Sequence, residues 1–164
     1  MRSYLIIMVV ILFSALSCSE SDDASDNPLT GDTERFQFYT NRSVAVGEND
    51  FAGISVGSSL VFEYTFTAED NPDLADDEYA ERILFQVDPE LNSFIFTNEE
   101  LISTNAYFDK FCFCLIEGSI PLEEGTISGE RVNNETWNVT IDVAFTDFEE
   151  ETRTITGSFR LTSP

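Results

Sequence analysis

The fold is decided by two stretches near the C-terminus, TWNVTIDVAFT at residues 136–146 and RTITGSFRLT at residues 153–162. In both stretches, apolar residues alternate with polar ones over four or five repeats. The apolar positions are Trp137, Val139, Ile141, Val143 and Phe145 in the first stretch, and Ile155, Gly157, Phe159 and Leu161 in the second. This period of two indicates strands with one buried face. It also places Trp137, which could otherwise be an exposed binding platform, in the core.

Working outward, SLVFEYTFT at residues 59–67 alternates in the same way. Weaker strands are expected at 36–39, 82–87, 93–97, 109–117 and 125–132, with hairpin turns at 132–136 and 147–151. One short helical turn is expected where Thr97 and Glu100 have the spacing of a capping box. About eight strands with regularly spaced turns predict an all-β fold, a single antiparallel β-sandwich, with a barrel as the alternative.

The N-terminus has the features of a targeting segment. Arg2 precedes an unbroken apolar run over residues 4–13, which is too short to span a bilayer and fits a signal peptide. Residues 18–33 lack periodicity and are rich in Ser and Asp, so we interpret them as a flexible tether. The expected organisation is a cleaved signal peptide at 1–17, the tether at 18–33 and a β domain at 34–164.

Leu16-Ser17-Cys18 resembles the lipobox of bacterial lipoproteins, in which the cysteine is acylated and becomes the first residue. The Ser and acidic residues at 19–23 resemble the export signal of Bacteroidota surface lipoproteins. The whole chain is similar to the small lipoproteins of that phylum, which carry one compact β domain. The resemblance implies lipidation at Cys18, attachment to the outer membrane through this lipid, and exposure at the cell surface.

The composition excludes several kinds of function. The 164 residues include 31 acidic and 8 basic residues, giving a formal charge of −23, and no histidine. Such a charge repels the phosphates of DNA and RNA, so nucleic-acid binding is excluded. The absence of histidine removes catalysis by Ser-His-Asp or Cys-His groups and metal sites built on histidine.

Cys112-Phe113-Cys114 is the sharpest local motif. On a regular strand both sulfurs would lie on one face, with Phe111 and Phe113 on the other, and the two cysteines would be too far apart for a disulfide without a bulge or bend. The pair is therefore open to three interpretations. These are buried free thiols, a local disulfide, or a redox or soft-metal site.

The acidic loops offer a weak candidate for calcium. Asp70, Asp73, Asp76 and Asp77 supply many oxygen ligands, which calcium prefers, but without the spacing of an EF-hand loop. The alternative is a solvated loop that preserves solubility. We expect no other cofactor.

These observations favour a membrane-anchored surface lipoprotein that acts as a binding module or envelope accessory without catalysis. Its expected partner is a glycan, another envelope protein or calcium. One alternative is a lipocalin-like barrel that binds a small apolar ligand. A further alternative is a small glycan hydrolase, which would use two carboxylates, although nothing in the sequence singles out a pair.

Overall fold

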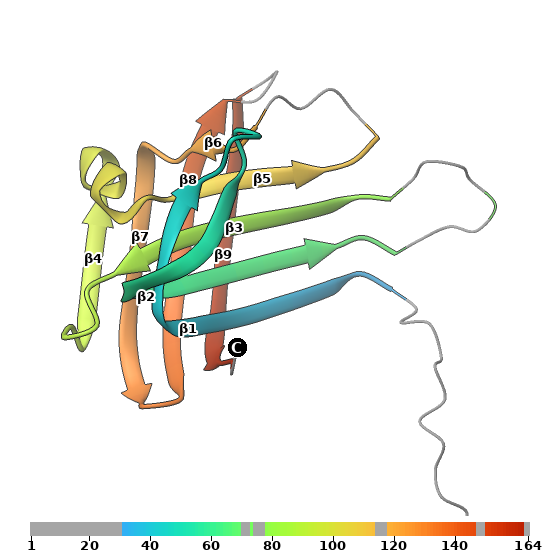
Figure 1. The fold of residues 1–164 in the computed structure, drawn as a ribbon. Helices are drawn as coiled ribbons and strands as arrows, with labels where there is room; N and C mark the ends of the chain where they lie inside the picture. Colours follow the sequence, from blue (N-terminus) through green and yellow to red (C-terminus); the bar gives the residue numbers. More distant parts are fainter. Residues whose placement is uncertain (1–30, 70–72, 74–77, 114–117, 147–149, 163–164) are drawn as a thin grey trace, which may run out of the picture.

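The computed structural model describes residues 31–69, 73, 78–113, 118–146 and 150–162 (Figure 1). This part of the chain forms nine strands and one short 3-10 helix, which confirms the all-β prediction. The elements are β1 Thr33–Val46, β2 Ala52–Thr67, β3 Ala80–Val87, β4 Ser93–Thr97, η1 Asn98–Thr104, β5 Tyr107–Phe111, β6 Ile120–Pro121, β7 Glu124–Asn133, β8 Thr136–Thr146 and β9 Glu150–Leu161.

All nine strands belong to one sheet in the order β4-β7-β8-β9-β1-β2-β3-β5-β6. The sheet is open, with β4 and β6 at its edges, so the barrel alternative is wrong. The prediction of a purely antiparallel sheet is also wrong in one place, because β9 pairs with β1 in parallel at Gln37–Arg160 and Phe38–Leu161. This short pairing joins the first strand of the domain to the last.

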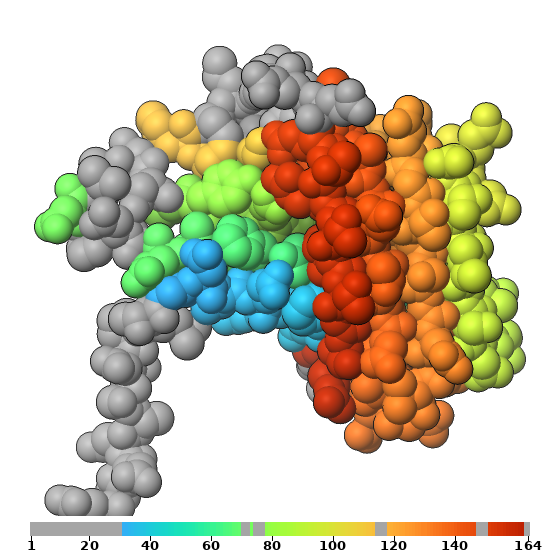
Figure 2. All heavy atoms as spheres, turned by 180° about the vertical axis from the view of Figure 1, so that it is seen from behind, coloured from blue at the N-terminus to red at the C-terminus, as the bar shows by residue number. Residues whose placement is uncertain are grey.

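The sheet bends at the β9–β1 pairing, so that its two halves pack face to face as in a sandwich. The strands β1, β2, β3 and β5 cross the strands β7, β8 and β9 (Figure 1). The main core lies between the halves and draws buried side chains from both. The outer face of the second half is polar, and β9, β8, β7 and β4 lie side by side across it (Figure 2).

Phe62 stands at the centre of this core. It lies on β2, is fully buried, and stacks on Phe85 of β3 with ring centroids 4.9 Å apart. It also forms T-shaped contacts with Trp137 of β8 and Phe159 of β9, with ring centroids 5.6 Å apart in both pairs. A third T-shaped contact joins it to Phe94 of β4, with centroids 5.8 Å apart. One ring therefore contacts strands of both halves, and Trp137, 1% exposed, is a core residue as predicted.

The three strongest alternating stretches all form strands, and most of the predicted side chains lie inside. The exceptions are Leu161, which is 38% exposed at the end of β9, and Phe66, which is only partly buried. Leu60, Phe62 and Tyr64 are buried on the inner face of β2. The capping box also forms, since the Glu100 carboxylate accepts a hydrogen bond from the Thr97 backbone N–H at 2.9 Å. The short strand β6 was not predicted, because two residues are too few to show an alternation of apolar and polar side chains.

The weakly patterned stretch at 43–57 forms the arms of a long β1–β2 hairpin. Its register shifts around Arg42, which pairs with both Val56 and Ser59, and Asn41 has a positive φ of 55°. Gly57 allows the arms to approach here, because a Cβ at that position would collide with the side chain of Ser43. Such a bulge bends a hairpin sharply.

The bent hairpin covers the outer face of the first half of the sheet. There it buries Val44 and Ala52 against Val61 and Leu84 in a second, smaller core. The Val44 backbone N–H also donates to the Gln86 side chain at 2.7 Å. Val61 and Leu84 are therefore buried on the face that simple alternation assigns to solvent.

We predict that Phe62→Ala costs about 3–5 kcal/mol of unfolding free energy, because it removes the ring that both halves contact. Urea unfolding of the variant measures this loss. The control is Ile102→Ala, since Ile102 is 58% exposed and its truncation is expected to cost no more than about 0.5 kcal/mol. Equal losses in the two variants would contradict the central position of Phe62.

Candidate functional site

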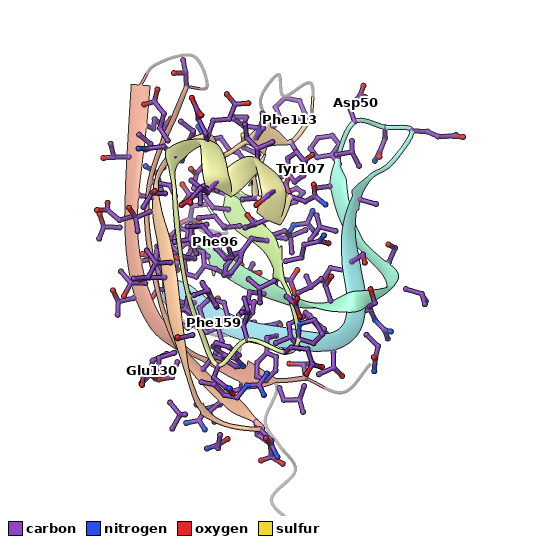
Figure 3. The ribbon with its side chains drawn as sticks, turned by 90° about the vertical axis from the view of Figure 1, so that its left-hand side faces the viewer. Asp50, Phe96, Tyr107, Phe113, Glu130 and Phe159 are labelled. Carbon is purple, nitrogen blue, oxygen red and sulfur yellow. The ribbon has the colours of Figure 1, made fainter. Side chains whose placement is uncertain are left out.

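Exposed aromatic rings gather where β5 ends. Phe111 is 40% exposed and Phe113 is 84% exposed, whereas the rings of the main core are buried. Phe51, in the β1–β2 hairpin, stacks on Phe111 with centroids 6.4 Å apart. We call this region, formed by Phe51, Phe111 and Phe113 and the two hollows beside Phe111, the Phe111 surface. Figure 3 labels Phe113 here, with Asp50 of the hairpin tip nearby.

The larger hollow lies between the hairpin and the end of β5 and has a volume of about 660 Å³. Its walls are mostly apolar and include Val46, Phe51, Ile54 and Phe111, with Arg82 as the one charged side chain. A volume in this range suits a small organic ligand or a single sugar ring.

The smaller hollow, of about 360 Å³, lies on the other side of Phe111. Tyr79, Phe111, Cys112 and Phe113 contribute to its walls, together with the end of β2. Because Phe111 lines both hollows, the two form one surface around its ring. Sequence reasoning missed this surface, since it treated residues 109–117 as one strand.

Arg82 is fixed at the floor of the larger hollow. Its Nε and Nη2 donate to the fully buried Asp109 at 2.8 and 2.6 Å, and Nη2 also donates to the backbone oxygen of Ala52 at 2.7 Å. Its guanidinium carbon lies 5.3 Å from the centre of the Phe111 ring. Ser119 donates to the second oxygen of Asp109, so the carboxylate is satisfied on both sides.

The Nη1 of Arg82 has spare hydrogen-bonding capacity. Within the described residues its nearest carboxylate is Glu63, at 4.0 Å, which is too long for a hydrogen bond. Glu63 also accepts from the Tyr39 hydroxyl at 2.7 Å. Burial and this carboxylate raise the pKa of Tyr39 above its ordinary value, so the phenol stays a donor at neutral pH. The larger hollow thus has aromatic walls and an arginine whose Nη1 forms no hydrogen bond within the described residues.

A second group of charges, which we call the charged cap, closes the main core next to the Phe111 surface. Arg153 of β9 binds Glu81 of β3 with two hydrogen bonds, at 2.6 and 3.0 Å, and Glu151 at 2.7 Å. Lys110 binds Glu151 at 3.2 Å. Arg153 also lies over the rings of Phe108 and Phe145, so its charge is held against the end of the aromatic core.

The charged cap shifts the titration of its members. Burial opposes ionisation of Glu81, but the hydrogen bonds from Arg153 and Tyr79 outweigh it and lower the pKa of this carboxyl. Burial and the same carboxylate raise the pKa of Tyr79 to about 12. Hydrogen bonds to Glu81, outweighing burial, raise the pKa of Arg153. All three groups keep their ordinary charge near neutrality, which is typical of a structural ion pair rather than of an acid–base catalyst.

The cysteine motif lies at the edge of the described chain. β5 ends at Phe111, and Cys112 and Phe113 lie in a bend, so the predicted strand over 109–117 is wrong at these two residues. Residues 114–117 of that prediction lie outside the described residues. The backbone turns here because Phe111 is the last residue that pairs with β3. Cys112 is disulfide-bonded, so it is not a free thiol. Cys114 lies outside the described residues, and its pairing with Cys112 stays a prediction.

The other predicted site residues lie mostly outside the described part of the chain. This holds for the lipidation candidate Cys18 and for the calcium candidates Asp70, Asp76 and Asp77. Asp73 is described and exposed. Among the described residues no group of three or more carboxylates or cysteines is placed to hold a metal ion. Lipidation and calcium binding therefore stay predictions.

We predict that Glu81→Gln destabilises the protein by about 1–2 kcal/mol at neutral pH. This is less than a fully buried pair would lose, because Arg153 is 28% exposed. Since folding lowers the pKa of Glu81, its contribution is complete above the ordinary glutamate pKa of 4.5 and is lost as the pH falls through the folded value. The difference in unfolding free energy between wild type and variant should therefore shrink as the pH falls. Urea unfolding at a series of pH values measures this difference. A gap that widens in acid would contradict this.

Comparison with known proteins gives no information about the function. No protein family, curated protein or solved structure matches this chain. None of the helices in the described ranges is long and apolar enough to cross a membrane. The features that point to a function are the Phe111 surface and the motifs of the N-terminus.

Proposed function

We propose that this protein is a lipid-anchored binding module of the bacterial outer membrane, exposed at the cell surface and without catalytic activity. The anchor is Cys18, which follows a signal-like apolar run and precedes an acidic tether. Two or more acyl chains hold a protein stably in a membrane, even one as acidic as this. The observation that carries the binding function is the Phe111 surface.

The Phe111 surface suits binding because it exposes apolar area that the fold does not need for its own core. Exposed aromatic rings beside hollows are favoured contact points for ligands, since they bury a large area at little cost in side-chain entropy. Arg82 lies in the same hollow, already held by Asp109, with Nη1 free to donate. A donor fixed in this way loses little freedom when a ligand binds.

The partner that we propose for this surface is a glycan. A sugar ring has an apolar face that stacks on an aromatic side chain such as Phe111, and hydroxyl oxygens that accept hydrogen bonds from a guanidinium such as Arg82. A glycan is preferred here to the apolar ligand of the lipocalin-like alternative, because the sheet is open and the space between its halves holds packed aromatic side chains.

We predict that Phe111→Ser weakens glycan binding about tenfold or more, because truncating a central aromatic contact costs more than about 1 kcal/mol. Titration calorimetry with soluble polysaccharides, chosen by screening an immobilised panel, measures this change. Ile102→Ser is the matched control, since it removes an exposed apolar side chain on η1. Equal loss in both variants, or no glycan bound by wild type, would overturn the proposal, whereas turnover of a bound glycan would support the hydrolase alternative.

We predict that Cys18→Ala moves the protein from the membrane fraction to the soluble fraction, because it removes the site of acylation. Protease treatment of intact cells tests the second part of the proposal, since a surface protein is digested while a periplasmic control protein is spared. Retention of Cys18→Ala in the membrane would contradict lipid anchoring. Protection of the wild-type protein would place it on the periplasmic side.

A further inference from the structure

We infer that β4 is a docking edge for an extended, basic segment of a partner protein, which would add to the sheet as a further strand. β4 is the edge strand at the opposite end of the molecule from the end of β5, and it pairs only with β7 (Figure 1). An open edge of this kind is a template for strand addition. This inference is independent of the glycan proposed for the Phe111 surface.

The backbone of β4 has N–H and C=O groups that point away from β7. The Arg131 N–H donates to the Asn92 oxygen at 2.9 Å, which fixes the hydrogen-bonded positions of the β4–β7 ladder. Because these positions alternate in antiparallel strands, Phe94 and Phe96 bond β7, while the N–H and C=O groups of Ile95 point to the free edge. No hydrogen bond within the described part of the chain uses these groups of Ile95.

The side chains around the edge suit an incoming strand. Ile95 is 70% exposed on the outer face, and no lysine or proline protects the edge, since residues 93–97 read SFIFT. On the other side of β4 is a hollow of about 580 Å³ whose walls include Val87, Leu91 and Phe96. A strand added beside β4 would direct alternate side chains toward this hollow and toward the outer face near Ile95. Figure 3 shows this side of the molecule.

The charges around β4 favour a basic partner. Asp88, Glu90, Glu99 and Glu130 are all exposed on the strand's neighbours, and Glu130 is directly opposite Ser93 in the register. The only basic residue in these neighbouring segments, Arg131, is directed to the Pro89 oxygen and the Trp137 ring. A second copy of this chain would bring the same acidic residues to the edge and be repelled. The occupant that fits is therefore a segment that alternates apolar and basic residues.

The test uses the full soluble chain without its signal peptide and a fluorescent peptide of alternating valine and lysine. Peptide binding, measured by fluorescence polarisation, is expected to weaken as salt rises. The amide of Ile95 is expected to exchange with solvent more slowly when the peptide is bound. Ile95→Pro removes the outward N–H without touching the β7 ladder and is expected to weaken binding about tenfold, whereas Ile95→Thr keeps the N–H and should bind.

A second pair of variants distinguishes binding at the β4 edge from attraction to the overall negative charge of the protein. This comparison does not require that β4 tolerate a proline. Glu130→Lys, beside the edge, should weaken binding several-fold more than Glu48→Lys, an equal charge change at the tip of the β1–β2 hairpin. Equal effects of these two variants would overturn the proposal, as would unchanged exchange at Ile95. Self-association of the protein that Ile95→Pro abolishes would show a second copy to be the occupant, and would overturn it as well.

Discussion

The Phe62 ring joins the two halves of the sheet, and the packing of the domain follows from its contacts. The described residues form a single sheet, and a single open sheet has no interior until it bends and packs against itself. Phe62 lies where the two halves meet, stacked on Phe85 within its own half and edge-on to Trp137 and Phe159 of the other. The parallel pairing of β9 with β1 holds the bend, but it involves only two residue pairs. Burial of these rings, together with the rest of the main core, therefore stabilises the packing of the two halves.

Two networks of paired charges lie next to the aromatic core, and each supplies a buried carboxylate with partners within the packed body. At one end of the core the strands carry Glu81 and Arg153 inward, and these charges are acceptable there because each satisfies the other. On the outer face, Asp109 is fully buried and depends on Arg82 and Ser119 in the same way. This second network also fixes the bent hairpin, since Arg82 holds the Ala52 backbone. The large excess of acid is thus compatible with a packed body, because the buried carboxylates have partners.

The two surfaces proposed for binding lie at opposite ends of the sandwich. The Phe111 surface lies at the end of β5, on the side of the sheet where β1 begins, while the β4 edge lies at the far end (Figure 1). A glycan at one end and a basic protein segment at the other would then be held by one molecule, as the two proposals together imply.

The all-β class, the inner face of the strongest strands and the core position of Trp137 could be read from the sequence, because they follow from a local period of two. Lipidation at Cys18 is predicted from neighbouring residues in the same way. The open sheet, the pairing of β9 with β1 and the place of β4 at an edge came from the structure, because strand order depends on contacts between distant segments. The exposure of Phe111 was decided in the same way, since β5 ends there and a distant hairpin folds beside it. An alternating pattern predicts which residues lie on the same face of a strand. It does not predict which other segments of the chain pack on that face.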